Sequence, residues 1–245
     1  MKRLECLMMR WNDDIYNVPA YSVADSARYL SIPTPTLNAW LRGRFYTTKK
    51  GQQAFAPLIQ RPDPTLPQLS FTNLVEAHVL KILRKVHNVK LSKVRSALDY
   101  MSYKLDTSHP LVTKRFQTDG VDLFVEQMDR LVNVSRSGQL VMRETLQRLL
   151  TRVEWDADGF AVRFFPNTLI EDIDLASDPK SDKIIFLDPS IRFGKPIIAA
   201  TGVPTDIIAE LYNAGDSIDD IAKEYDCTPL QIKAAIRFEF QNRAA

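Results

Sequence analysis

Seven residues between positions 34 and 50 have side chains that could contact the bases or phosphates of a DNA duplex. They carry hydroxyl, amide, guanidinium and ammonium groups, and they are Thr34, Thr36, Asn38, Arg42, Arg44, Lys49 and Lys50. Hydroxyl and amide groups can reach base edges, whereas Arg and Lys neutralise phosphate charge. Because these types gather within one short stretch, the sequence predicts an interface with double-stranded DNA.

Two short helices with a tight turn between them are expected to position these side chains. The first opens with the capping-box pattern of residues 22–25. Pro33 stops it, and the second helix is expected to have Thr34 as its N-cap, Pro35 in its first position and Gly43 at its end. Two such helices form a helix-turn-helix unit, whose second helix can enter the major groove.

A β-hairpin is expected directly after the two helices. Residues 44–48 and 53–55 have aromatic side chains at strand-like positions, and they flank a Lys-Lys-Gly-Gln turn at residues 49–52. The glycine can supply the positive φ that a tight hairpin turn needs. A basic hairpin tip beside a recognition helix would form a wing that presents charge to phosphate. A solvated turn is the alternative, since lysine is common at loop tips.

The charge of the chain is unevenly distributed, although its net value is only +2. Residues 1–104 contain 16 Lys and Arg against 7 Asp and Glu, which gives +9. Residues 105–183 contain 10 against 14, which gives −4, and residues 184–245 contain 6 against 9, which gives −3. A basic first segment suits an anionic polymer, whereas the acidic remainder should avoid one. Chance clustering of surface lysines is the alternative, but the basic excess coincides with the helix-turn-helix pattern.

Two longer helices are expected after a proline-rich connection at residues 57–67. The first has an apolar face from Val75 to Val86 and is capped by Ser70 or Thr72. The second has an a/d seam over residues 91–105, which is only two heptads long. Packing inside the chain and a homodimer interface explain this seam equally well.

The first hundred residues resemble the winged helix-turn-helix of MerR-type regulators. The resemblance lies in Ser22-Val23-Ala24-Asp25, Arg42-Gly43-Arg44-Phe45 and the Lys49-Lys50-Gly51 hairpin, with two helices after the wing. It implies a DNA-binding domain over residues 1–105.

The middle segment is expected to be a small α+β unit over residues 106–166. Its first hairpin is predicted to have a Thr-Asp-Gly turn at residues 118–120, between strands at residues 115–117 and 121–125. The alternation of apolar and acidic residues in the second of these strands is typical of a half-buried strand.

A second hairpin and a helix complete this unit. Asp158-Gly159 predicts a turn between strands at residues 153–155 and 160–164, and residues 140–150 have a helical period. Residues 167–183 are expected to be an acidic linker. A metal cluster is the less favoured alternative there, because no His ligand lies nearby.

Three helices are expected near the C-terminus. Gly215 ends the first, and capping boxes at Ser217 and Thr228 open the other two. The last two helices form a second helix-turn-helix shape. Because acidic residues border it and duplex binding needs phosphate neutralisation, we expect this unit to pack against a second copy or a partner protein.

Residues 184–245 resemble the family catalogued as domain of unknown function 433, whose members resemble antitoxins of bacterial type II toxin–antitoxin pairs. Turn formers, a Gly-Lys-Pro run and a helix-ending glycine carry the resemblance: Asp188, Pro189, Gly194, Lys195, Pro196, Thr201, Pro204 and Gly215. The family usually has Gly-Thr-Arg where this chain has Ala200-Thr201-Gly202, so the role of that arginine is absent or relocated here. With its winged domain the chain resembles the longer VapB-type antitoxins, which implies a PIN-like ribonuclease toxin as partner.

The sequence contains no motif typical of an enzyme, a metal centre or a cofactor site. It has no His-Glu-x-x-His, nucleophile elbow or dinucleotide fingerprint, and Cys6 and Cys227 are too far apart in sequence to suggest a metal-ligand pair. His78 and His87 are expected on a helix surface or between helices. No apolar run approaches the ~20 residues of a transmembrane helix. The first residues do not resemble a signal peptide, so a cytoplasmic protein is expected.

The sequence therefore predicts a mainly α fold with small β-hairpins, divided into residues 1–105, 106–166, 167–183 and 184–245. The predicted function is that of an antitoxin. It would bind and neutralise a PIN-like ribonuclease toxin and, as a homodimer, repress its own operon by binding operator DNA. A ligand-responsive regulator of MerR type without a toxin is the alternative. Neither function requires a catalytic residue, a metal or a cofactor.

Overall fold

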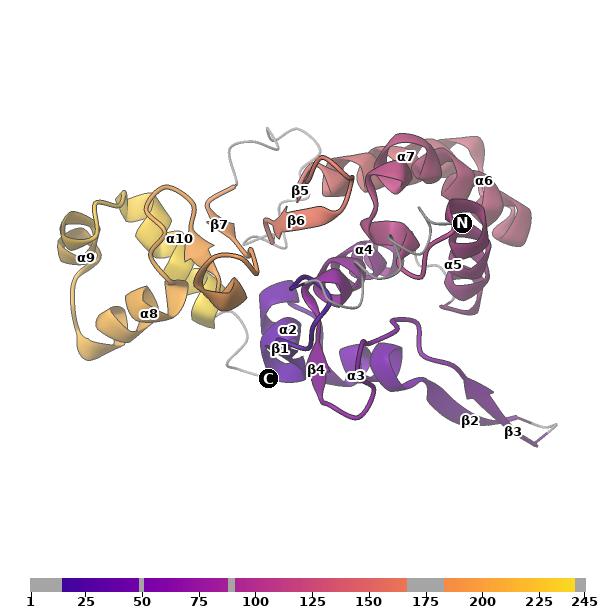
Figure 1. Ribbon diagram of the computed structural model, residues 1–245, viewed down its shortest axis with the longest axis horizontal. Helices are drawn as coiled ribbons and strands as arrows, with labels where there is room; N and C mark the ends of the chain where they lie inside the picture. Colours follow the sequence, from indigo (N-terminus) through magenta and orange to yellow (C-terminus); the bar gives the residue numbers. More distant parts are fainter. Residues whose placement is uncertain (1–14, 49–50, 88–90, 167–182, 241–245) are drawn as a thin grey trace.

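The computed structural model of the chain describes residues 15–48, 51–87, 91–166 and 183–240. Over these ranges the protein is mainly helical, with short two-stranded antiparallel sheets between the helices (Figure 1). The expected fold class is therefore confirmed. None of the helices within these ranges is long and apolar enough to cross a membrane.

The helix-turn-helix is present, and local signals explain where its helices begin and end. α2 (Val23–Leu30) begins after Ser22, whose hydroxyl oxygen accepts a hydrogen bond from the Asp25 amide at 3.0 Å. α3 (Thr34–Arg42) ends at Gly43, which has a φ of +75°. The sequence predicted Thr34 as the N-cap of α3, but the N-cap is Pro33. The carbonyl of Pro33 already accepts the first hydrogen bonds of the helix.

The predicted wing is a hairpin of β2 (Arg44–Thr48) and β3 (Gly51–Phe55), which extends away from the helices (Figure 1). Its register pairs Arg44 with Phe55 and Thr48 with Gly51. The second strand thus begins two residues earlier than expected, because the pairing continues up to a two-residue connection, the commonest hairpin loop. That connection, residues 49–50, lies outside the described residues.

Two long helices, α4 (Phe71–His87) and α5 (Leu91–Leu105), follow as expected. Ser70 is the cap of α4: its Oγ accepts from the Asn73 amide at 3.1 Å, and Asn73 Oδ1 accepts from the Ser70 amide at 3.3 Å. Before α4, β4 (Gln68–Leu69) pairs with β1 (Tyr21–Ser22) and so joins the starts of α2 and α4. Val94 and Met101 of α5 are buried within the chain, so internal packing accounts for the a/d seam.

The first hairpin predicted for the middle segment is wrong. A single π-helical turn, η2 (Phe116–Gly120), leads instead into α6 (Val121–Val132). Phe116, Phe124 and Met128 are buried with helical spacing. Gly120 has a helical φ of −72°, and a Cβ there would lie 2.8 Å from the ring of Phe116. The glycine is therefore needed for close packing and not for a turn, which explains why the Thr-Asp-Gly signal misled the prediction.

The other elements predicted for the middle segment are confirmed. The segment begins with a short helical turn, η1 (Pro110–Val112), which precedes η2 and α6. The predicted helix at residues 140–150 is part of α7 (Arg136–Leu150). β5 (Val153–Trp155) and β6 (Ala161–Phe164) form the second hairpin. Asp156 Oδ1 shapes its turn by accepting hydrogen bonds from the amides of Asp158 and Phe160, at 3.0 and 2.9 Å. All but the last residue of the predicted acidic linker, 167–183, lie outside the described residues.

The three predicted C-terminal helices are α8 (Thr205–Ala214), α9 (Ile218–Glu224) and α10 (Pro229–Phe240). Their predicted caps are confirmed: Ser217 Oγ accepts from the Asp220 amide at 3.2 Å, and Thr228 Oγ1 accepts from the Gln231 amide at 3.3 Å. A small sheet of β7 (Ile185–Phe186) and β8 (Ile197–Ile198) precedes them, with a turn, η3 (Arg192–Gly194), in the connection.

Two clusters of buried apolar side chains stabilise most of this structure. The larger extends from Tyr21 to Leu187 and includes residues of α2 to α7. The smaller fills the space between α8, α9 and α10, where Ile208, Ile221 and Ile232 are buried. The larger cluster crosses residues 105–106, where a domain boundary is predicted from the sequence; the boundaries stay a prediction.

His78 of α4 lies between elements and not on a helix surface. Its ring centroid lies 4.8 Å from that of Phe164 on β6, and the side chain is buried. Burial first, and then the charges of Lys81 and Arg152, lower the pKa of His78 well below its ordinary value. The fold therefore accommodates the neutral imidazole.

Acidification is expected to destabilise the fold through His78. In the unfolded chain the imidazole binds a proton below its ordinary pKa of about 6.5, whereas in the fold it stays neutral. The free energy of unfolding should then fall by up to about 1.4 kcal/mol per pH unit below that value. Urea denaturation at a series of pH values measures this slope. His78→Leu should make it shallower, and an unchanged slope in that variant would contradict the assignment.

Candidate nucleic-acid interface

One face of α3 anchors the helix, and the other is open to solvent. The side chains of the anchoring face are almost fully buried and are Leu37, Trp40 and Leu41. On the open side, Thr34 and Arg42 are exposed, while Thr36 and Asn38 are half-buried. Four of the predicted DNA-contact residues thus lie on an accessible helix surface of this chain.

The remaining predicted contacts belong to the hairpin. Arg44 is the first residue of β2, so it follows the end of α3 directly. Lys49 and Lys50 connect β2 to β3 and lie outside the described residues. The wing thus starts at the C-terminal end of α3, and the roles of these three side chains stay a prediction.

Arg61 is a cation beside α3 that the sequence analysis missed. Burial, followed by the charge of Arg42, lowers the pKa of the Arg61 guanidinium. The guanidinium donates hydrogen bonds to the carbonyls of Pro64, at 2.8 Å, and Leu66, which hold it in place. Arg61 is the only Lys or Arg of the proline-rich connection, 57–67, so no pattern of basic residues in the sequence indicated it.

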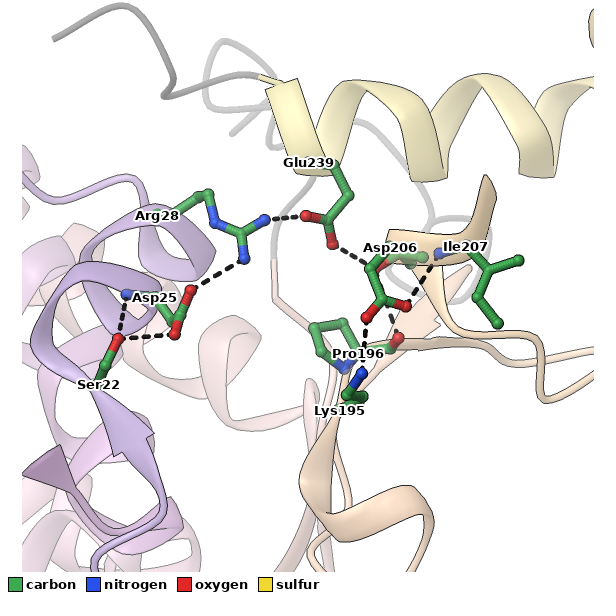
Figure 2. A network of polar contacts seen from close by, with 9 residues as sticks. Ser22, Asp25, Arg28, Lys195, Pro196, Asp206, Ile207 and Glu239 are labelled. Carbon is green, nitrogen blue, oxygen red and sulfur yellow. Dashed lines mark hydrogen bonds and ion pairs between the residues drawn. The ribbon is translucent and has the colours of Figure 1, made fainter. Parts of the chain in front are cut away.

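The C-terminal unit docks on α2, the first helix of the helix-turn-helix. Figure 2 shows the Arg28 guanidinium of α2 between Asp25 on its own helix, at 3.1 Å, and Glu239 of α10. The carboxylate of Glu239 also accepts a hydrogen bond from Thr205 Oγ1 at 2.5 Å. Burial alone would lower the pKa of Arg28, but the charges and hydrogen bonds of Glu239 and Asp25 outweigh it and raise that pKa. Arg28 therefore remains charged and connects the two ends of the chain.

Aromatic packing accompanies this ion pair. The rings of Tyr29 on α2 and Phe238 on α10 stack with centroids 5.4 Å apart and an interplanar angle of 18°. The Arg28 guanidinium lies 4.8 Å from the centroid of the Tyr29 ring. Burial is the largest cause of the raised pKa of Tyr29. The contact is thus both polar and apolar.

Gly194 packs closely against Tyr21 on β1, just before the helix-turn-helix. It has a φ of +76°, and a Cβ at this position would lie 2.2 Å from the Oη of Tyr21 on β1. Tyr21 is itself buried. Gly194 is one of the residues that carry the family resemblance. It is required both for its backbone conformation and because a larger side chain would have no space.

Several other residues of the resemblance make contacts within the C-terminal unit or join it to β6 of the middle segment. Asp188 Oδ1 accepts from the amide and the hydroxyl of Ser190, at 3.0 and 2.5 Å, while Asp188 Oδ2 pairs with Arg163 at 3.1 Å. Lys195 forms an ion pair with Asp206 at 2.8 Å, which raises the pKa of the lysine. Further contacts involve the carbonyl of Pro196, the hydroxyl of Thr201, the backbone of Pro204 and the helix-ending Gly215.

No group of three or more His, Cys, Asp or Glu side chains in the described ranges could hold a metal ion. The exposed surface of α9 is acidic, with Asp219, Asp220 and Glu224 open to solvent. The acidic groups at α9 lie at one end of the molecule, well separated from the accessible basic groups at α3 (Figure 1).

Comparisons with known proteins agree with this division. Residues 19–98 match a family described as "Putative DNA-binding HTH domain", and residues 185–238 match one described as "Protein of unknown function (DUF433)". A Mycobacterium tuberculosis protein named "Putative antitoxin VapB45" is 27% identical over 242 residues, with 90% of this chain and 94% of that protein covered. The uncharacterized protein Rv2308 of the same organism is 23% identical, with 92% of each chain covered.

A solved structure has the same arrangement. The crystal structure of Rv2018 from Mycobacterium tuberculosis matches with a TM-score of 0.65 and 25% identity, and the match covers 90% of this chain and 99% of that one. The fold is thus shared over nearly the whole chain. This protein therefore carries a C-terminal domain of the DUF433 family joined to an N-terminal helix-turn-helix domain.

Proposed function

We propose that this protein is the antitoxin of a bacterial type II toxin–antitoxin pair. It represses its own operon as a cytoplasmic homodimer and neutralises a PIN-like ribonuclease toxin. The observation that carries the proposal is the match over 90% of the chain to a protein named as a putative antitoxin. The accessible face of α3, with Thr34 and Arg42 exposed, supports the DNA-binding half.

The acidic surface at α9 supports the other half. Asp216, Asp219, Asp220 and Glu224 are exposed, and they would repel the phosphates of a duplex. An acidic surface complements the basic cleft in which a ribonuclease binds RNA, and such complementarity speeds association. The two ends of the chain therefore suit two partners of opposite charge.

Loss of the basic groups at α3 and the wing is expected to weaken DNA binding and its salt dependence. Each phosphate contact contributes about 0.9 to the slope of log K against log salt concentration. The triple variant Arg42→Ala, Lys49→Ala, Lys50→Ala should thus have a slope smaller by up to about 2.7. Mobility-shift titrations of DNA from upstream of the gene, at several salt concentrations, measure it.

A matched control removes cations elsewhere. Arg130 and Arg136 are exposed on α6 and α7, and changing both to Ala should leave the slope unchanged. An unchanged slope in the triple variant would reject the contact assignments.

A second candidate function is a ligand-responsive regulator without a toxin, which the cavity described below favours. Co-expression with the product of the adjacent gene separates the two. An antitoxin should co-purify with that product and restore growth to cells that produce it. A regulator without a toxin should do neither.

A further inference from the structure

A large cavity lies between the proline-rich connection, the end of α5 and the middle segment. Its volume is about 1010 Å³. Its walls come from the proline-rich connection, from the end of α5 with the loop after it, from residues 113–118 and from the turn of the β5–β6 hairpin. Cavities of this size hold metabolite-sized molecules.

Three cations face this cavity: Arg61, Lys114 and Arg115. No carboxylate of the described residues forms an ion pair with any of them. The guanidinium of Arg61 donates to main-chain carbonyls, and that of Arg115 donates to the Leu105 carbonyl at 3.3 Å. Carbonyls fix the position of a guanidinium without neutralising its charge. Two carboxylates, Asp106 and Asp158, also border the cavity, so the charge of the groups that face it remains positive.

A buried polar chain makes one wall rigid. His109, which lines the cavity, lies with its Nδ1 3.0 Å from Glu76 Oε1. The side-chain Nδ2 of Asn73 donates hydrogen bonds to Glu76 Oε2 at 3.2 Å and to the main-chain carbonyl of Gln60 at 2.8 Å. All three side chains, His109, Glu76 and Asn73, are buried. A wall held in this way is preorganised for a ligand.

We propose that this cavity binds a small organic molecule with several carboxylate or phosphate groups. A concave site whose charged groups carry a net positive charge concentrates anions. Arg61 and Arg115 present guanidinium groups that suit carboxylate and phosphate oxygens, and Lys114 adds a mobile ammonium group. Leu105 and Phe160 provide apolar wall for the carbon skeleton. The proposal does not depend on the toxin or on operator binding.

The test uses the full chain and three probes: ATP, citrate and pyrophosphate. Isothermal titration calorimetry should show one-to-one binding of at least one probe, and that probe should raise Tm by about 5 °C at about 100 times its Kd. The double variant Lys114→Ala, Arg115→Ala should bind it at least tenfold more weakly. Both side chains are exposed, so the variant should retain its fold, which circular dichroism verifies.

The control variant Arg130→Ala, Arg136→Ala removes two exposed cations away from the cavity and should bind the probe normally. Absence of binding for all three probes at millimolar concentration would overturn the proposal, as would equal binding by the two double variants. A further result against it would be a loss of DNA affinity by the Lys114, Arg115 variant, in anion-free buffer, equal to that of Arg42→Ala. That result would mean that Lys114 and Arg115 contact the DNA duplex.

Discussion

Replacement of Gly194 by Ala is expected to lower the free energy of unfolding by about 3 kcal/mol. The φ of +76° at this position costs a residue with a Cβ about 1–2 kcal/mol. In addition, the new Cβ would lie 2.2 Å from Tyr21 Oη and 3.0 Å from its Cζ. Because Tyr21 is buried, either the ring or the turn must move, at a further cost of about 1–3 kcal/mol. Urea denaturation of both proteins measures the loss.

Gly202 offers a matched control for the backbone contribution. Its φ is +71°, and a Cβ there would meet no atom within 4 Å. Gly202→Ala should therefore lower the free energy of unfolding only by the contribution of the backbone conformation. A second control is Tyr21→Phe, since the buried Oη of Tyr21 has no hydrogen-bond partner among the described residues. In the Tyr21→Phe background, Gly194→Ala should lower the free energy of unfolding by a smaller amount. If Gly194→Ala and Gly202→Ala lowered it equally, the contact with Tyr21 would be contradicted.

Loss of the Arg28 guanidinium is expected to destabilise the contact between α2 and α10. In Arg28→Met the carboxylate of Glu239, whose side chain is 6% exposed, would keep its hydrogen bond from Thr205 but lose its counter-charge. Uncompensated buried charges cost about 3–5 kcal/mol, and the partial exposure of Arg28, 21%, places the expected loss near 2–3 kcal/mol. Thermal and urea unfolding measure it.

A double-mutant cycle isolates the pair. Glu239→Gln removes the charge that needs Arg28, while Arg28 keeps its contact with Asp25. The double variant Arg28→Met, Glu239→Gln should therefore be more stable than Arg28→Met alone. If the double variant lost as much free energy of unfolding as the two single variants together, the ion pair would contribute nothing to stability.

Local signals predicted the ends of helices well, because a cap needs only residues three positions apart. Ser22, Ser217 and Thr228 each accept the predicted amide hydrogen bond. The same kind of reasoning failed at Gly120, where a turn signal was read without knowledge of the ring of Phe116. The result was a hairpin in place of a π-helical turn and a helix.

Contacts between distant residues were beyond reach of the sequence. Arg28 and Glu239 are 211 positions apart, and neither belongs to a motif that would pair them. Similarly, the cations of the cavity come from positions 61, 114 and 115, which only the fold brings together. For the candidate interface, the sequence predicted the accessible side of α3 but overlooked Arg61, because a single arginine among prolines has no periodicity to reveal it.

The docking of α10 on α2 limits how this architecture can be reshuffled by recombination. Arg28 and Tyr29 on one side meet Glu239 and Phe238 on the other, and Gly194 fits against Tyr21. A gene fusion that joined this N-terminal half to a foreign C-terminal half would inherit only one side of the contact. Such chimaeras should survive only when both sides are exchanged together, so the two halves are expected to evolve as a matched set.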